Sequence, residues 1–303
     1  TDQDRRIFLN AIGPVWDGNE VWLVIVAGGL LAGFPPVYAT LLSGFYNLIM
    51  IFLCGLIFRA VAIEFRSKQT SLLWRKAWDM TFSLASFLIG FILGLGLGNL
   101  IQGVPLDQEG NFIGSFSLFF RPYPILIGLF TTTLFIMHGS IYLAMKTEGV
   151  LHERLRIWVK LSIFLFVIIY FITTFSTWMF MPHMVERIQE YRWLSLVPVA
   201  ALLAILNVPR LFSLKKDFQA FLFSCLGIIL MLVVFGIGTF PNLVRSLVQP
   251  DLLSLNFLNA SGSELNLTVL LIIVAIGLPF VFCYSAMIYR VFRGKVKIEA
   301  SSY

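Results

Sequence analysis

The sequence predicts an all-α protein that crosses a membrane several times, as a polytopic membrane helical bundle with about eight transmembrane helices in this chain. Hydrophobic residues make up 58% of its 303 positions, and charged residues make up only 13%. A soluble domain carries roughly a quarter charged residues, whereas the mean hydropathy here is +0.88. A chain of this composition requires lipid as its solvent, and we expect a single integral membrane domain over residues 1–303.

Each span needs about 20 mostly apolar residues to cross the hydrocarbon core of a bilayer. The sequence offers eight such runs, at 14–34, 38–59, 79–100, 124–145, 160–181, 194–208, 218–240 and 267–289. Pro35-Pro36 is expected to fold the first two spans into a tight hairpin, because proline cannot continue a helix. The sixth run is short and contains Pro198.

The basic residues predict the orientation of these spans, since Lys and Arg concentrate in cytoplasmic loops. One set of span ends holds 18 of the 22 Lys and Arg residues. The opposite ends hold only Arg121, Arg187, Arg192 and Arg245. This split favours an even number of spans, with both termini of this chain on the cytoplasmic side of the membrane. The net charge of +6 is spread over short loops, which argues against a nucleic-acid partner.

An acidic pair stands at the start of the first span, in the run Trp16-Asp17-Gly18-Asn19-Glu20-Val21-Trp22. The apolar stretch that follows Glu20 is too short to span, so the helix is expected to begin at Pro14 and to draw both acids into the membrane. The i, i+3 spacing places both carboxyls on one helix face. A carboxylate inside a membrane favours an ion or proton path. The alternative is that Asp17 only caps the helix and interacts with its dipole.

Two further acids flank the second and third spans. Glu64 follows the second span among Arg59, Arg66 and Lys68, where it serves either a proton path or an ion pair. Asp79 is expected to be the N-cap of the third span.

The histidines limit the cofactors that this chain could hold. Only His138 lies within an expected span, whereas His152 and His183 lie in loops or at span ends. Bis-histidine haem ligation needs two facing histidines, and a catalytic zinc site typically needs three protein ligands. We therefore expect no metal site and no catalytic residue in this chain, with His138 as a hydrogen-bonded interior residue.

Three glycines recur at intervals of four residues in the third span, at Gly90, Gly94 and Gly98. Small residues on one face allow a second helix to approach closely. The stripe predicts helix packing, and it leaves open whether the neighbour belongs to this chain or to a partner.

Several motifs resemble subunit II of cytochrome bd-type quinol oxidases. The first is the Trp-Asp-Gly-Asn run that contains Asp17. The resemblance continues through Phe34-Pro35 to Tyr46, Phe58 to Lys68, Gly98 to Pro105, and His138 to Gly149. These motifs cover the first half of the chain, and the second half matches mainly in hydropathy.

This resemblance implies nine transmembrane helices in a full-length family member, with the first of them preceding the start of this chain. The opening Thr-Asp-Gln-Asp-Arg-Arg is accordingly expected to lie inside a loop. The resemblance also implies that this chain binds no cofactor by itself, that a partner subunit I holds haems b and d, and that the complex oxidises quinol and reduces oxygen to water. It assigns the proton path from the cytoplasm to Asp17, and the positions of Glu20 in the first span and of Glu64 after the second span make them further candidates for this path.

Partners implied by the resemblance are the haem-bearing subunit I, membrane lipid and quinone, with room for a small single-helix accessory subunit. Two other functions remain open from the sequence alone. A secondary transporter would show internal repeats and broken helices around a midplane site, and neither is apparent here. A purely structural assembly subunit would use Asp17 and Glu20 only for packing.

Overall fold

The structure is a computed structural model that describes residues 1–297. Among these residues, seven helices are long and apolar enough to span a membrane, and α1 with α2 forms an eighth candidate that is bent by 46°. The all-α membrane bundle of about eight spans is therefore confirmed. The helices are α1 (Asp2–Ile12), α2 (Trp16–Gly33), α3 (Pro35–Gly44), α4 (Tyr46–Phe65), α5 (Leu72–Gln102), α6 (Pro122–Lys146), α7 (Gly149–Phe180), α8 (His183–Glu190), α9 (Leu196–Ser213), α10 (Asp217–Thr239), α11 (Pro250–Leu253) and α12 (Glu264–Val291).

The helices fall into two compact units. Unit 1 comprises 1–86, 104–114 and the chain from Asn242 onward, and unit 2 comprises 87–103 and 115–241. The first part of α5 belongs to unit 1 and its second part to unit 2. The single membrane domain expected from the sequence stays a prediction.

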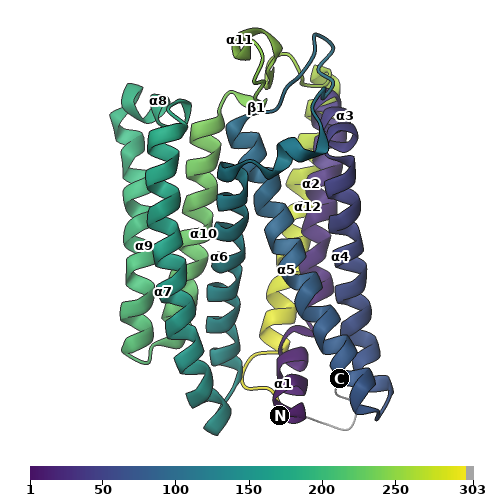
Figure 1. The fold of residues 1–303 in the computed structure, drawn as a ribbon, viewed down its shortest axis with the longest axis vertical. Coiled ribbons are helices and arrows are strands. Elements are labelled where there is room, and N and C mark those ends of the chain that lie inside the picture. Colours follow the sequence, from purple (N-terminus) through teal and green to yellow (C-terminus); the bar gives the residue numbers. More distant parts are fainter. Residues whose placement is uncertain (298–303) are drawn as a thin grey trace. The chain divides into compact units, whose positions relative to one another are not determined.

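Unit 1 is built around α2, which packs against α3 on one side and α12 on another (Figure 1). At the far end of α2 from its first turn, the backbone N–H of Gly262 donates to the carbonyl of Gly33 at 2.8 Å, which holds the start of α12 beside the end of α2. Two short strands, β1 (Asn242–Val244) and β2 (Leu255–Asn256), pair antiparallel in the connection that leads to α12. These contacts fix α12 alongside α2, where the acidic pair lies.

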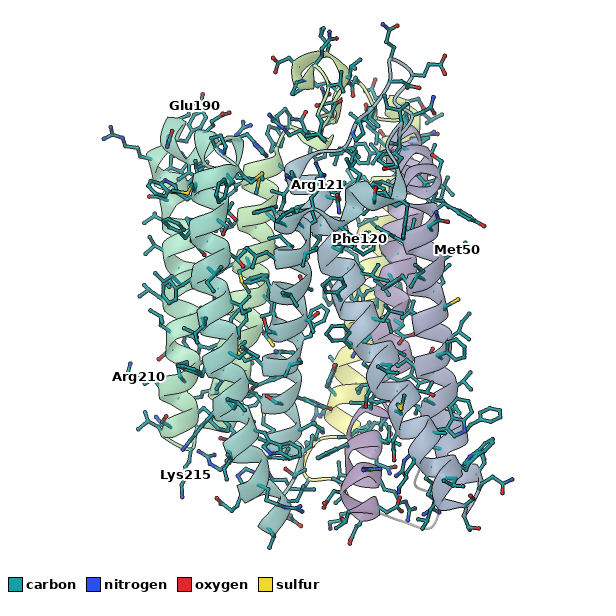
Figure 2. The ribbon with its side chains drawn as sticks, in the orientation of Figure 1. Met50, Phe120, Arg121, Glu190, Arg210 and Lys215 are labelled. Atoms are coloured by element: carbon teal, nitrogen blue, oxygen red, sulfur yellow. The ribbon has the colours of Figure 1, made fainter. Side chains whose placement is uncertain are left out.

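Unit 2 is a bundle whose helices follow one another as antiparallel neighbours. The pairs α6–α7 and α9–α10 are joined by short turns, and α10 also packs against α6 and α8. Phe166, Phe212 and Ile205 lie in its core, with exposures of 2% or less. Figure 2 shows Glu190 at one end of this unit and Arg210 with Lys215 at the other. The turns that carry most of its basic residues therefore gather at one end, as the charge split predicts.

Several expected helix boundaries differ from the structure, since α5 begins at Leu72 and not at 79, and α7 begins at Gly149 and not at 160. The helix that holds the acidic pair begins at Trp16 and not at Pro14, because a turn separates it from α1. The second span covers Tyr46–Lys68 and not 38–59, since the chain breaks at Phe45 after the short helix α3. The sixth span covers 192–213 and tolerates Pro198, because the proline lies in the first turn of α9 where a missing N–H is harmless.

Candidate functional site

The acidic pair occupies the first turns of α2. The N-cap is Val15, whose side chain makes no capping hydrogen bond, so Asp17 is not the N-cap that the capping alternative requires. Asp17 lies instead in the first turn, where a carboxylate still interacts favourably with the helix dipole. Its side chain is exposed, and within residues 1–297 no hydrogen bond or ion pair engages it, while Glu20 is half-buried. The two acids therefore share a helix start and differ in environment.

Glu20 is bound by an arginine from α4. The Nη1 of Arg59 donates to Glu20 Oε1 at 2.6 Å, and the guanidinium lies 5.8 Å from the centre of the Phe82 ring of α5. About a quarter of each side chain remains exposed, 24% for Arg59 and 23% for Glu20. Arg59 is close to Glu64 along the chain, and its pair with Glu20 could not be predicted because these two residues are 39 positions apart.

Two tyrosines of α12 contact the same turn of α2. The hydroxyl of Tyr289 accepts a hydrogen bond from Asn19 Nδ2 at 3.3 Å and lies 3.5 Å from Asn19 Oδ1. The ring of Tyr284 lies over Gly18, where an added Cβ would approach its Cε1 to 3.1 Å. No sequence signal pointed to these residues, since 270 positions separate Asn19 from Tyr289. The site thus brings phenol hydroxyls close to the acidic turn.

Glu64 lies near the end of α4 and is half-buried. Of the three cations expected around it, Arg59 binds Glu20 and Arg66 binds Asp79 and Asp2. The structure therefore places Glu64 in unit 1 with the acidic pair, while two of its expected ion-pair partners are engaged elsewhere.

Arg66 is the centre of an ion-pair network that joins α1 to α5. Its Nε donates to Asp79 Oδ1 at 2.5 Å, and its Nη2 donates to Asp2 Oδ1 at 2.7 Å. Arg5 and Arg75 bind the outer oxygens of the same two acids. Only 2% of the Arg66 side chain is exposed. This network fixes α1, and with it the bend that precedes the acidic turn.

The expectation that Asp79 is an N-cap is wrong. α5 begins at Leu72, so Asp79 lies inside the helix and faces Arg66. The charged residues Arg75 and Lys76 suggested a loop, but the helix extends beyond the apolar run to carry them.

The three histidines lie in unit 2 and bind different groups. His138 Nδ1 is 2.8 Å from Ser224 Oγ, and its ring stacks on Phe221 at 4.8 Å. His152 lies 3.0 Å from the carbonyl of Ala144, and His183 lies 2.9 Å from that of Ile101. In the described part of the chain, no three His, Cys, Asp or Glu side chains gather as a metal site would require.

The glycine stripe of α5 faces α6 of this same chain. A Cβ added at Gly94 would lie 2.5 Å from Thr131 Oγ1 and 2.6 Å from the carbonyl of Ile127. At Gly98 it would lie 2.6 Å from the Cα of Pro124, whereas at Gly90 the nearest atom is 3.3 Å away. The two backbones approach so closely that Gly94 and Gly98 leave no room for a side chain.

Buried hydrogen bonds also join α5 to the segment that precedes α6. Asn99 is fully buried and donates to the carbonyls of Leu95 and Phe119, and its Oδ1 accepts from Arg121 Nη2 at 3.0 Å. Figure 2 shows Arg121 at this junction. Burial lowers the pKa of the Arg121 guanidinium, which keeps its charge because its ordinary pKa is so high. This contact stabilises the fold of unit 2.

Fold and site together define a multi-pass membrane subunit with an embedded acidic turn. Residues 1–292 match the sequence profile of a family described as cytochrome bd terminal oxidase subunit II. The chain is 30% identical to the cytochrome bd-I ubiquinol oxidase subunit 2 of Escherichia coli K12, over 98% of this chain and 86% of that protein. It is 34% identical to the cytochrome bd ubiquinol oxidase subunit 2 of Bacillus subtilis 168, over 97% and 86%.

A third relative is the probable cytochrome oxidase subunit 2 of Haemophilus influenzae, which is 28% identical over 97% of this chain and 85% of that protein. The chain therefore belongs to the cytochrome bd terminal oxidase subunit II family. This result favours the oxidase interpretation of the sequence over a secondary transporter.

Proposed function

We propose that this chain is a haem-free subunit of a bd-type quinol oxidase and that it conducts protons from the cytoplasm through Asp17. The observation that carries the proposal is the position of Asp17, an exposed carboxylate at the first turn of a membrane helix. A carboxylate in a membrane segment usually faces a protein interior or a water-filled path and not lipid. The exposed face of α2 is accordingly assigned to contact with the partner subunit I.

The groups around Asp17 suit proton transfer. Asn19 and the hydroxyl of Tyr289 can each donate and accept hydrogen bonds, so they can order water beside the carboxylate. Glu20 holds a second carboxylate one turn further along, bound by Arg59. Glu64 is assigned to the approach to this turn, on the neighbouring helix α4.

The donor set of this chain supports placing the haems in the partner. Within residues 1–297, His138 is half-buried in α6 and its Nδ1 engages Ser224, whereas His152 lies in the first turn of α7 and contacts the carbonyl of Ala144. A bis-histidine haem site would need a second histidine facing it. The relatives are named ubiquinol oxidase subunits, and by extension we assign haems b and d and the oxidation of quinol to subunit I. Quinone, lipid and a small accessory subunit are further proposed partners of the complex.

The orientation follows from the basic ends of the helices. We place the ends that carry Arg66, Lys146 and Lys216 in the cytoplasm, with both termini of this chain on that side of the bacterial plasma membrane. The end of the chain, residues 298–303, lies outside the described residues. Single cysteines at Lys216 and Ser263, in a background without native thiols, should label from opposite sides of the membrane, and labelling from one side would refute the orientation.

The proposal is tested by Asp17→Asn in the purified complex. The amide keeps the shape of the side chain but cannot exchange a proton near neutral pH, so quinol-driven oxygen consumption per haem should fall severely while haem content stays near wild type. Glu20→Gln should retain most of the turnover at neutral pH. Full turnover of Asp17→Asn would refute the proton route. Loss of haem together with activity would favour a purely structural role.

A further inference from the structure

Arg59 binds one of the two acids of the α2 turn and leaves the other without a cation. Its guanidinium lies 2.6 Å from Glu20 Oε1, and among the described residues no arginine or lysine pairs with Asp17. The charges that act on Glu20 are those of Arg59 and Asp17, so the three groups form one electrostatic cluster. The net formal charge of the cluster with both acids ionised is therefore −1.

Water cannot fully replace either partner of the Arg59–Glu20 ion pair, because both side chains are largely shielded. Three quarters of each side chain is shielded from solvent, and the Phe82 ring covers the guanidinium at 5.8 Å. Charges separated by one helical turn interact more strongly in such surroundings than they do in bulk water. The charge of Arg59 should therefore change the electrostatic potential at Asp17.

Other titratable groups near the turn come from the helices packed around α2. From α12, Tyr289 binds Asn19 and Tyr284 lies over Gly18. Asp79 of α5 is bound by Arg66 and Arg5. The remaining titratable groups on α1, α3, α4, α5 and α12 are Asp2, Asp4, Arg6, Tyr38, Tyr46, Cys54, Glu64, Arg75, Lys76, Glu264, Cys283 and Arg290. Among the described residues, Arg59 is the one cation that forms an ion pair with an acid of α2.

We propose that Arg59 is a positioning residue that neutralises Glu20 and leaves Asp17 as the single uncompensated carboxylate of the α2 turn. This inference rests on the proposed proton route. In this arrangement the α2 turn carries one uncompensated negative charge, at Asp17, because the charge of Arg59 balances that of Glu20 in their ion pair. Arg59 therefore sets the pH range over which the route works, although it does not itself carry the proton.

The test is the pH profile of quinol oxidation by the purified complex, measured per haem. Arg59→Gln leaves Glu20 as an unpaired negative charge beside Asp17. The acid limb of the profile, where activity falls as the pH is lowered, should therefore move to higher pH. Glu20→Gln leaves Arg59 as an unpaired positive charge, so the acid limb should move to lower pH. Each shift should be roughly 1 pH unit, the lower end of what a neighbouring charge produces, because the side chains are partly exposed.

The double variant Glu20→Gln with Arg59→Gln removes both charges and should restore an acid limb close to that of wild type. Arg59→Lys keeps the charge and should also stay close to wild type. Arg210→Gln, an exposed arginine at the end of α9 in unit 2, loses the same charge far along the chain and should leave the limb unmoved. A role in packing alone would not move the limb in opposite directions.

The proposal is overturned if the two single variants shift the limb in the same direction, or if neither moves it. Glu20→Gln creates no additional unpaired carboxylate, and an unmoved limb in this variant overturns the proposal even where Arg59→Gln fails to assemble. The proton route is tested separately. If Asp17→Asn is inactive and the opposing shifts are absent, the route stands and the role of Arg59 is refuted, whereas full turnover of Asp17→Asn refutes the route itself.

Discussion

The two units use their polar residues in different ways. In unit 2, Asn99 is fully buried and its amide and carbonyl are both bonded within the unit, and His138 engages Ser224. In unit 1, Asp17 and Asn19 are exposed, and Tyr289 is 42% exposed although it lies on a membrane helix. The hydrogen-bonded polar groups of unit 2 hold its bundle together, whereas the exposed polar groups of unit 1 remain available to a partner or to water.

Packing follows the same division. α6 buries 12 of its 25 residues, and α12 buries none of its 28. The glycines of α5 let α6 approach to backbone contact, while α12 meets α2 through side chains such as Trp22 and Phe282, whose rings are 5.5 Å apart. Unit 2 therefore has a core of its own, and the α2–α12 face of unit 1 is where we place the proposed partner contact.

The largest expected effect on stability comes from Arg66→Met in unit 1. This change removes three hydrogen bonds from the buried guanidinium to Asp79 and Asp2 and leaves these acids only Arg5 and Arg75 as partners, at a cost of about 3–5 kcal/mol. Arg75→Met is the matched control, because Arg75 is 25% exposed, pairs with one acid, Asp2, and otherwise donates to the carbonyl of Gln69, and it should cost about 0–1 kcal/mol. The stability of the two variants would be compared by thermal unfolding. Equal losses of stability would contradict the central role of Arg66 in the network.

A smaller effect is expected in unit 2 from Gly94→Ala. The added methyl group would collide with Thr131 and with the carbonyl of Ile127, so α5 and α6 must separate at a cost of about 1–3 kcal/mol. Gly96→Ala on the same helix meets open space and should be neutral or slightly stabilising. Equal unfolding temperatures for the two variants would show that the stripe does not hold the helices together.

The smallest effects on stability are expected from removing the hydroxyl of one tyrosine in each unit. Tyr123→Phe removes a hydroxyl that is buried in unit 2 and lies 2.9 Å from Thr177 Oγ1, and it should cost about 1 kcal/mol. Tyr289→Phe removes an exposed hydroxyl and should change stability by less than about 0.5 kcal/mol. A Tyr289→Phe variant of the complex that unfolds earlier than Tyr123→Phe would contradict the distinction between the units.

The sequence predicted the class of fold well because span length and hydropathy are local properties. Its boundaries failed where helices extend past the apolar runs, as α5 does from Leu72, so Asp79 was mistaken for a helix start. The break at Phe45 was missed for a related reason, since the apolar run continues through it without a proline or a charge. Hydropathy indicates which residues lie in lipid, and a helix can extend beyond those residues.

The site could be predicted only in part. Asp17 and Glu20 were found because charges are conspicuous in an apolar run. The partner of Glu20 was not found, since Arg59 is nearer to Glu64 along the chain and only the packing of α2 against its neighbours selects Glu20. Tyr289 gave no signal, because tyrosine near a helix end is equally typical of the membrane interface.

The central claim is that Asp17 delivers protons, and proton uptake tests it most directly. The complex would be reconstituted in sealed vesicles, and a pH-sensitive dye would follow proton uptake from the side that carries the basic helix ends during quinol-driven oxygen reduction. We expect Asp17→Asn to slow this uptake severely while the haem content stays near that of wild type. Uptake by Asp17→Asn at the wild-type rate from the same side would contradict the account.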